Sequence, residues 1–590
     1  VNVWSLFDAK GYSYNNYAVM SGYWPRLYQL SIPDRNFETM AASGMPSPFQ
    51  QEGNFYTATV PLRTDLKWTD GTPFTADDVA FTINTALSFQ LGFDWDDFYN
   101  PDFIDHADAV DSYTVKFYFK QQPNVGVWQY GALQGPIVQK AYWSSKVSAS
   151  AELLPPADLA PQIAALTAQV AAIQSKINEL NSNLMLLSNN SIGYSQTIAD
   201  IKSQTDNLNQ TNTSLAKAQT QYDSAMDAAR QSLYALDNTN EPTLGDWMPA
   251  GQVNGEWINK VNPAHPFNTP KFNSAVYKTY ASEDDVVNAF QYSDVDEILE
   301  TDGLSSNVIV KFGLSIPMMT SQSYTVSFLI FNLSNPIFID SPFRQALACI
   351  MDTKTMIGKS SYINTLDSFI ISGEKTWNAL NIITPCNDLD LNSRILKAKQ
   401  ILETAGYTWQ TLPAPQPGPK TYWNGLTMPN GNPLPTITLL TSPESFGMLN
   451  WLTFEQSTGE LGIPFQAGGS SNGVNYAVFS SHQFDMALLG YNVSEYPGYL
   501  CDWFKDGNPF GYQSDRLQSA CEALNSTSDL STAQKDVYEI QSILAQDLPF
   551  IPLYSSITYD AYRNIKYPFD SVLGGLSGVY GAPSLAIPAP

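Results

Sequence analysis

The feature that most restricts the fold is a heptad repeat between residues 155 and 236. There the composition changes to Ala, Gln, Ser, Leu and Ile, and apolar residues follow one another at alternating intervals of three and four. This spacing places them on one stripe of an α-helix that pairs with a second helix. The stripe consists of Ile163, Leu166, Val170, Ile173, Ile177, Leu180, Leu184 and Leu187. A first helix of about 28 residues would reach about 42 Å at 1.5 Å per residue.

A second stripe follows the polar segment 188–193, so we expect an antiparallel coiled-coil hairpin within residues 151–237. Because Thr205, Asn212 and Gln219 are polar members of this stripe, weaker pairing is expected near them. The hairpin is either a self-packed insertion or an arm that docks on a surface layer, a permease or a second copy. The second stripe contains Tyr194, Ile198, Ile201, Thr205, Leu208, Asn212, Leu215, Gln219, Tyr222, Met226 and Leu233.

A strand end, a turn and a helix are predicted within residues 66–86, which read LKWTDGTPFTADDVAFTINTA. The run 70–73 has the Gly and Pro of a tight turn, and Thr75 with Asp78 forms a capping box that opens the helix. The buried face of this helix is expected to contain Val79, Ile83 and Leu87. Alternating apolar residues in 55–62 and 113–119 add two strands, with Val115, Phe117 and Phe119 on one face.

The amino-acid identities in this strand-turn-helix unit are more specific than its predicted geometry. The run 68–82, WTDGTPFTADDVAFT, resembles the signature of the family 5 solute-binding proteins of ABC importers, which capture oligopeptides, dipeptides, nickel complexes or oligosaccharides outside the cell. Residues 343–352, FRQALACIMD, and 396–407, LKAKQILETAGY, resemble further segments of that family. The resemblance implies an α/β, two-lobed fold like that of periplasmic binding proteins (large cluster C type), with an extra α+β subdomain and a ligand cleft between lobes.

The resemblance also implies a division of the chain into discontinuous parts. We expect the first lobe to form from three segments, the second lobe from one, and the subdomain and hairpin to be insertions. The expected segments are 1–54 (first lobe), 55–150 (α+β subdomain), 151–237 (hairpin), 238–322 (first lobe), 323–536 (second lobe) and 537–590 (first lobe and C-terminal tail).

The net charge of the chain limits the classes of partner that it can bind. Lys and Arg number 30 and Asp and Glu 56, so the net charge of −26 repels nucleic acid and anionic membrane surfaces. Few charged residues, 15% of the chain, are typical of an exterior protein and would suit an acidic medium. No run of about 18 apolar residues occurs. The start at Val1 suggests a removed signal or anchor, so an extracellular, cell-surface location is expected.

Cysteine spacing gives no CxxC motif, and the chain is expected to hold two disulfides between sequence neighbours in an oxidising compartment, or else four buried thiols. The expected pairs are Cys349 with Cys386 and Cys501 with Cys521. Sequons that permit glycosylation occur at Asn189, Asn209, Asn212, Asn332, Asn492 and Asn525.

Peptide-binding relatives anchor the ligand's amino group with an Asp in a loop after a Gly-Trp strand. The matching run here is 490–497, where that Asp is missing and Glu495 is the nearest carboxylate. The strand itself would pair with peptide backbone. Aromatic rings suited to stacking on sugars are expected at the cleft walls. The candidate ligand-binding residues are Trp24, Gly490, Tyr491, Asn492, Ser494, Glu495, Tyr496 and Trp503.

Catalytic and metal-binding patterns are weak. The three histidines stand apart from one another, and no P-loop is present, so energy for transport would come from a separate ATPase. Residues 469–473 match Gly-x-Ser-x-Gly but lie in a polar run rather than between an apolar strand and a helix. The sequence therefore predicts a binding protein without cofactor that captures oligopeptides for an ABC permease. The alternatives are an oligosaccharide-binding protein of the same family and a cell-surface structural protein.

Overall fold

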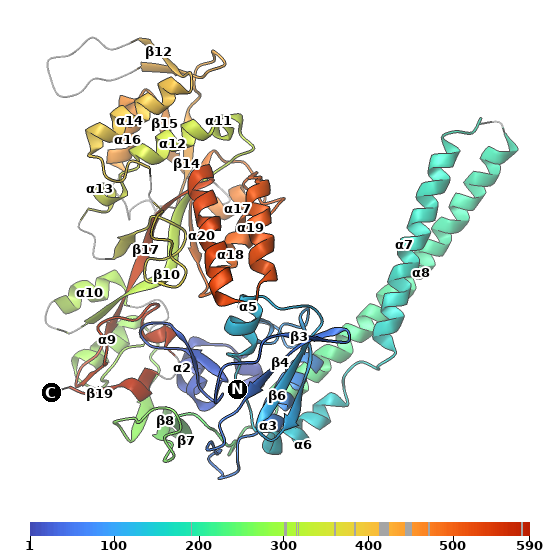
Figure 1. Ribbon diagram of the computed structural model, residues 1–590, viewed down its shortest axis with the longest axis vertical. Coiled ribbons are helices and arrows are strands. Elements are labelled where there is room, and N and C mark those ends of the chain that lie inside the picture. The colour runs from blue at the N-terminus through green and yellow to red at the C-terminus, as the bar shows by residue number, and fades with distance from the viewer. Residues whose placement is uncertain are drawn as a thin grey trace.

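The computed structural model describes residues 1–189, 191–299, 304–313, 316, 318–358, 362–382, 385–411, 424–442, 451–469, 473–579 and 582–589. Two lobes lie one above the other in Figure 1, and a long helical arm projects from the side of the lower one. Part of the run 469–473, which matches Gly-x-Ser-x-Gly, lies outside the described residues.

The lower, first lobe combines the N-terminal segment with residues after the arm. Its core includes fully buried Trp4 and Trp24, and it contains the three-stranded sheet β7-β8-β9. The elements of this lobe are α1 (Val3–Leu6), α2 (Tyr14–Met20), β1 (Tyr28–Leu30), β2 (Phe37–Thr39), β7 (Trp247–Val253), β8 (Glu256–Val261), β9 (Ser274–Tyr277), α9 (Glu283–Gln291), α10 (Ser306–Phe312), β18 (Ile565–Lys566) and β19 (Ile587–Pro588).

The predicted strands and capped helix form a subdomain beside this lobe. Thr75 is the N-cap of α3, and its backbone N–H donates to the Asp78 carboxylate at 2.9 Å. Val115, Phe117 and Phe119 are all fully buried on one face of β6, as predicted. The four-stranded sheet has the order β3-β4-β6-β5. Its elements are β3 (Gln50–Glu52), β4 (Phe55–Pro61), α3 (Ala76–Ser88), α4 (Asp94–Phe98), β5 (Ile104–Asp111), β6 (Thr114–Phe119), α5 (Val125–Val127) and α6 (Lys140–Ala151).

The upper, second lobe is built on a six-stranded sheet of order β11-β17-β10-β16-β14-β15. Helices cover this sheet and enclose the largest hydrophobic core among the described residues. The elements are β10 (Met318–Phe331), α11 (Pro336–Ile339), α12 (Ser341–Ile350), α13 (Thr353–Ile357), β11 (Ile363–Thr365), α14 (Leu391–Thr404), β12 (Thr408–Thr411), β13 (Asn424–Thr427), β14 (Ile437–Leu440), α16 (Leu452–Glu460), β15 (Phe465–Gly468), α17 (Val474–Phe479), β16 (Met486–Asn492), α18 (Tyr499–Phe504), α19 (Asp515–Ser526), α20 (Leu530–Asp547) and β17 (Phe550–Ala561).

Two antiparallel strands, β10 and β17, run from one lobe into the other (Figure 1). Their register shifts between Gln322 and Val326, which is where we predicted a boundary between lobes. The boundary expected at residue 536 falls within α20, whose buried residues as far as Leu544 belong to the second-lobe core, and the division of the chain into segments stays a prediction. This amphipathic helix packs on α19.

The arm consists of two long consecutive helices, α7 (Leu159–Leu184) and α8 (Ile192–Tyr234), that lie side by side (Figure 1). Between residues 161 and 187 the eight members of the predicted first stripe are buried or half-buried, and every other residue is exposed. The helical hairpin and its first stripe therefore agree with the heptad pattern. That the helices wind around one another as a coiled coil stays a prediction.

The second stripe was partly wrong. Thr205, Asn212 and Gln219 are exposed, and Ile198 is 46% exposed. Thr211 and Ala218, at 5% and 4% exposure, take the places expected for Asn212 and Gln219. The physical reason is that small residues fit where two helices approach closely, and a pattern based on large apolar residues overlooks them. The expected weakening at polar seam positions therefore does not apply to those residues.

The root of the hairpin is built into the body. Leu233 is fully buried, and the Asn2 side-chain amide donates to its carbonyl oxygen at 3.0 Å. The Arg230 guanidinium donates to the carbonyl oxygens of Phe89 and Gln90 at 2.9 and 2.7 Å. The arm is thus anchored rigidly at one end.

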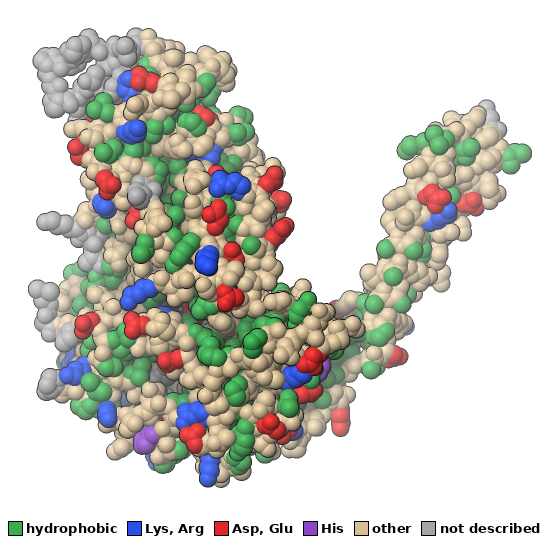
Figure 2. All heavy atoms as spheres, in the orientation of Figure 1, with side chains coloured by type: hydrophobic (Ala, Val, Ile, Leu, Met, Phe, Trp, Pro, Cys, Tyr) green, Lys and Arg blue, Asp and Glu red, His purple; other side chains and the backbone are tan. Residues whose placement is uncertain are grey.

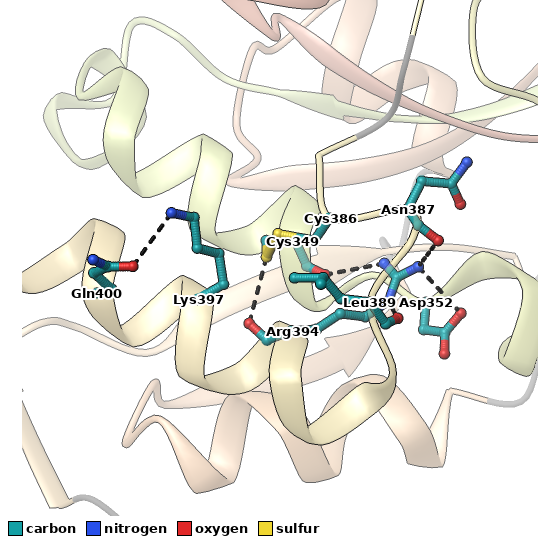
Figure 3. Close-up of a disulfide and its surroundings, with 8 residues drawn as sticks. All are labelled: Cys349, Asp352, Cys386, Asn387, Leu389, Arg394, Lys397 and Gln400. Atoms are coloured by element: carbon teal, nitrogen blue, oxygen red, sulfur yellow. Dashed lines mark hydrogen bonds and ion pairs between the residues drawn. A yellow bond between two sulfur atoms is a disulfide. The ribbon is translucent and has the colours of Figure 1, made fainter.

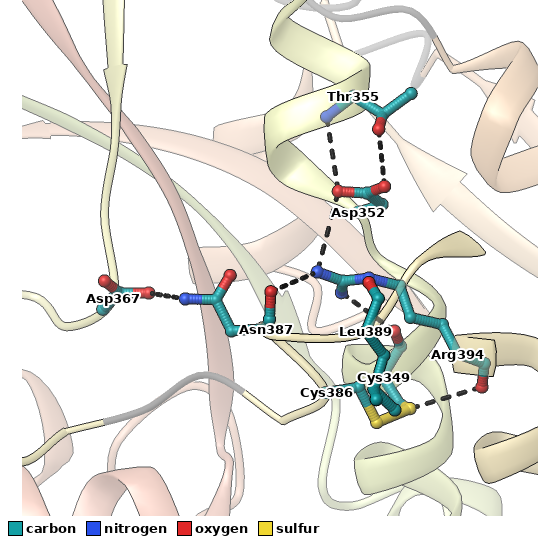
Figure 4. A network of polar contacts seen from close by, with 8 residues as sticks. All are labelled: Cys349, Asp352, Thr355, Asp367, Cys386, Asn387, Leu389 and Arg394. Carbon is teal, nitrogen blue, oxygen red and sulfur yellow. Dashed lines mark hydrogen bonds and ion pairs between the residues drawn. A yellow bond between two sulfur atoms is a disulfide. The ribbon is translucent and has the colours of Figure 1, made fainter.

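Both predicted disulfides form, Cys349–Cys386 and Cys501–Cys521. Figure 3 shows the first beside Arg394, whose guanidinium donates to the carbonyl oxygens of Cys349 and Leu389 at 3.2 and 2.9 Å. Figure 4 extends this network through Asp352, 3.7 Å from the same guanidinium. The disulfide and the buried Arg394 together hold the loop before α14 against α12.

One sequon is inaccessible in the folded chain. Asn332 is 9% exposed, and its amide donates to the Phe484 carbonyl oxygen at 2.8 Å. Asn492 accepts a hydrogen bond from the Thr325 hydroxyl at 2.6 Å but is exposed. Asn189, Asn209, Asn212 and Asn525 are also exposed, so glycosylation stays a prediction at these positions.

Candidate functional site between the lobes

A charged contact joins the two lobes at the loop after β16. The turn between β1 and β2 places Arg35 there with a positive φ of 60°, and the Arg35 N–H donates to the Ser31 carbonyl oxygen at 2.7 Å. The Arg35 guanidinium forms an ion pair with the Glu495 carboxylate. The Arg35 side chain is 9% exposed and that of Glu495 38%. A nearly buried cation from one lobe thus meets a carboxylate from the other.

A second carboxyl group lies close to Arg35. Glu374 is 7% exposed and accepts a hydrogen bond from the Tyr324 hydroxyl at 2.6 Å. Burial raises the pKa of Glu374, while the Tyr324 hydroxyl and the positive charge of Arg35 oppose that rise. The site is therefore rich in carboxyl groups, and Arg35 supplies the positive charge that balances them.

Three aromatic rings complete the contact. Tyr130 and Tyr496 lie 5.6 Å apart between ring centroids, and Trp377 lies 5.9 Å from Tyr130 and 5.6 Å from Tyr496. In the described part of this contact, the Tyr496 hydroxyl, the Trp377 Nε1 and the Arg35 Nε are among the buried atoms that lack a hydrogen-bond partner.

The predicted strand supplies backbone next to this cluster. Gly490, Tyr491 and Asn492 pair with Ser327, Val326 and Thr325 of β10. On its other side β16 pairs with β14 at Met486 and Ala487, and within the described residues no strand continues that pairing to its end. That edge is suited to an extended ligand. Ser494 turns its hydroxyl to the Tyr496 carbonyl oxygen at 2.8 Å.

Two predicted cleft residues, Trp24 and Trp503, lie in different surroundings. Trp24 is fully buried in the first lobe and donates from Nε1 to Glu241 at 2.8 Å. Trp503 packs within the second lobe against Tyr491 and Phe328, with ring centroids 4.6 and 5.2 Å away. Large flat rings stabilise a core by the area they bury, so Trp24 is not a cleft wall. Trp503 is half-buried beside Tyr491, so its role at the cleft stays a prediction.

The sequence pattern missed most of the cluster. Arg35, Tyr130, Glu374 and Trp377 come from three segments far apart in the chain, so no local spacing connects them. One signal was available for Arg35, because it lies in a turn sequence, IPDRN, in a chain that has few cations. Nothing comparable marks the other three.

A separate cavity of about 360 Å³ lies within the first lobe, between α2, β9 and the C-terminal segment. Glu297 lines it and accepts a hydrogen bond from the Tyr567 hydroxyl at 2.8 Å. Burial raises the pKa of Glu297 to about 8, so the group is largely protonated at neutral pH. This cavity involves none of the residues of the interlobe cluster.

Solved structures of other proteins share the fold of this chain. The unliganded open form of the periplasmic murein tripeptide-binding protein MppA aligns with a TM-score of 0.65 and 13% identity, over 100% of this chain and 95% of MppA. The ABC transporter substrate-binding protein CtaP of Listeria monocytogenes gives 0.60 and 15%, over 98% and 95%. NikZ of Campylobacter jejuni, in complex with Ni(L-His), gives 0.52 and 16%, over 98% and 96%. The chain therefore has the two-lobed fold of periplasmic binding proteins.

No curated protein matches the sequence. The family model of bacterial extracellular solute-binding proteins, family 5, matches residues 45–176 and 195–510, which is more than half of the 590 residues. The chain belongs to the family 5 extracellular solute-binding proteins.

Proposed function

We propose that this protein captures oligopeptides between its lobes and that Glu495 holds the ligand's amino terminus. Family 5 proteins are extracellular or periplasmic and deliver ligands to a membrane permease and its ATPase. Of the helices that the structure describes, none is long and apolar enough to cross a membrane. The ligand class is the part that we infer from the site.

The observation that carries the proposal is the Arg35–Glu495 ion pair. A guanidinium on this carboxylate occupies the position that a peptide's ammonium group would take. In the proposed complex, the ammonium displaces Arg35, and the peptide backbone pairs with the edge of β16 that no described strand pairs beyond Ala487. Hinge motion at the shift in register of β10 would open and close the lobes around the ligand.

The first experiment is native mass spectrometry of the purified protein, followed by denaturation and identification of any released molecule. We expect a mixture of short peptides. Glu495→Gln should then weaken peptide binding by about tenfold or more, because a charge-assisted hydrogen bond contributes about 1.5–3 kcal/mol. Asp502→Asn is the matched control, since the Asp502 side chain is 77% exposed in the same lobe.

Arg35→Ala gives the sharper test, because it removes a competitor for Glu495 rather than a ligand contact. We expect tighter binding of a peptide with a free amino terminus and no gain for the same peptide when its amino terminus is acetylated. Weaker binding of both peptides would assign Arg35 to the ligand instead and contradict the proposed displacement.

An oligosaccharide is the second candidate, and the rings of Tyr130, Trp377 and Tyr496 favour it because sugar rings stack on aromatic faces. Released oligosaccharide would replace the peptide proposal. A protein that emerges empty and ignores both ligand classes would favour the surface scaffold, whose cleft is filled by its own side chains.

A further inference from the structure

The outer end of the helical hairpin is apolar and uncharged. Residues 180–199 contain no Asp, Glu, Lys or Arg. Within this segment Met185, Leu186 and Ile192 are 86%, 84% and 91% exposed, and we call these three residues the hairpin tip. Figure 2 shows hydrophobic side chains at the far end of the arm, with the nearest acidic and basic side chains further down.

The hairpin tip is not needed to hold the two helices together. Leu184 and Leu187 continue the first stripe and are half-buried, whereas Met185 and Leu186 lie between them and face away from the partner helix. Exposed apolar side chains cost free energy in water, and large ones gathered on a projecting end indicate an interaction surface. The family match also omits residues 177–194, so the tip lies outside the segments that match the family model.

We propose that the hairpin tip inserts shallowly into a lipid surface. A stable protein partner would need about 20–30 residues on each side of an interface, and a narrow convex turn cannot supply them. A lipid surface needs no complementary shape and accepts apolar side chains flanked by uncharged polar ones. Ser, Asn and Gln surround the tip, and Tyr194 is half-buried at its base.

Electrostatics explains why the tip sits at the end of an arm. The chain has a net charge of −26, which an anionic bilayer repels. This repulsion is screened over about 10 Å at 0.1 M salt. Helix α7 has 26 residues and spans about 39 Å at 1.5 Å per residue. An arm of this length lets the uncharged tip reach lipid while the charged body stays several screening lengths away.

This proposal rests on the delivery of ligands to a membrane permease by family 5 proteins, and not on the identity of the ligand. Loss of peptide binding would leave it untouched, and loss of lipid binding would leave the peptide proposal untouched. The arm would hold the binding protein near the membrane by a contact that is weak and reversible, because three side chains bury little apolar area.

Co-sedimentation with phosphatidylcholine vesicles tests the proposal on the full chain. We expect the triple variant Met185→Ser, Leu186→Ser, Ile192→Ser to lower the lipid-bound fraction at least tenfold. The matched control is Val310→Ser, Leu380→Ser, Leu452→Ser, whose residues are 73%, 91% and 71% exposed on the body. The control should bind lipid like the unaltered protein, and both variants should keep its thermal unfolding midpoint.

A spectroscopic readout separates insertion from loose adsorption. Each of the single variants Met185→Trp and Leu452→Trp adds one exposed indole, and the unaltered protein provides the fluorescence to subtract. We expect vesicles to shift the emission of the added indole to the blue in Met185→Trp and to leave it unchanged in Leu452→Trp.

Three results would overturn the proposal. The first is an unaltered protein that does not sediment with vesicles, or does so equally with and without the tip. The second is a dimer in sedimentation velocity that the tip variant dissociates, which would assign the surface to a second copy. The third is a glycan found on Asn189 of the protein from its source, because a glycan there would keep the tip in water.

Discussion

In the helical hairpin, contacts come from residues three and four apart on two consecutive helices, whereas the interlobe cluster joins Arg35, Tyr130, Trp377 and Tyr496 from distant segments. The hairpin buries a continuous apolar stripe, and the cluster relies on one ion pair, a hydrogen-bonded carboxyl group and three rings. A stripe of that kind persists, while a small polar contact can open. The difference suits a fixed arm and a cleft that must release its ligand.

The largest expected effect is a difference in the free energy of unfolding lost by substitutions at the root of the hairpin and in its free arm. Leu233→Ala removes a fully buried side chain at the root and should lower the free energy of unfolding by about 4 kcal/mol. Leu180→Ala removes a half-buried side chain in the arm and should cost about 1 kcal/mol. Urea unfolding of the full chain measures both. Equal costs would show that the root is no better anchored than the arm.

The lobes and the arm also differ in how they hold carboxyl groups. The lobes bury several of them, whereas Glu179 of the arm is exposed. Glu241 is 7% exposed and accepts from the Nε1 atoms of Trp24 and Trp143 at 2.8 Å each. Burial raises its pKa from 4.5 to about 7, so the folded state binds the proton more tightly than the unfolded chain. This stabilisation is complete below about pH 4.5 and is lost as the pH rises through 7, about 3 kcal/mol in all.

We therefore expect the free energy of unfolding to fall between pH 5 and pH 8. Burial raises the pKa values of Asp94 and Asp560 to about 6, which acts in the same direction. Glu241→Gln keeps an acceptor for the indoles but cannot titrate, so its unfolding should depend less on pH. Greater stability at pH 8 than at pH 5, or an unchanged slope in Glu241→Gln, would contradict the assignment. Stability at low pH would agree with the acidic medium suggested by the composition.

A side chain added between the lobes should change free energies less than the two changes above, but it should act directly on lobe closure. A Cβ atom on Gly126 would lie 2.6 Å from the ring of Tyr496, across the interlobe contact. Gly126→Ala should hold the lobes apart and weaken ligand binding about tenfold, or about 1.4 kcal/mol. Small-angle scattering should show a larger radius of gyration. Gly459→Ala is the control, because no atom lies within 4 Å of its added Cβ, and equal behaviour of the two variants would contradict this effect of the added side chain.

How far the sequence predicts structure differs between the same two regions. Periodicity located the hairpin helices, and turn chemistry located α3 with its N-cap at Thr75, because the forces involved act within a few residues. The resemblance identified the fold and one side of the interlobe cluster, Glu495 and Tyr496. It could not locate Arg35 or Trp377, because their role depends on how two lobes meet. Trp24 was misassigned because residue type alone does not tell a core ring from a cleft ring.

The smallest expected effect tests the corrected stripe of α8. Gln219 is exposed, so Gln219→Leu should leave the local stability of the arm within about 0.5 kcal/mol of its original value. Ala218 is 4% exposed, and Ala218→Asn should weaken the arm because it forces a larger, polar side chain between the helices. Amide hydrogen exchange along α8 reports this local stability directly. Slower exchange in Gln219→Leu, with no change in Ala218→Asn, would restore the original stripe and show that the helices pair in the register that large apolar residues alone predict.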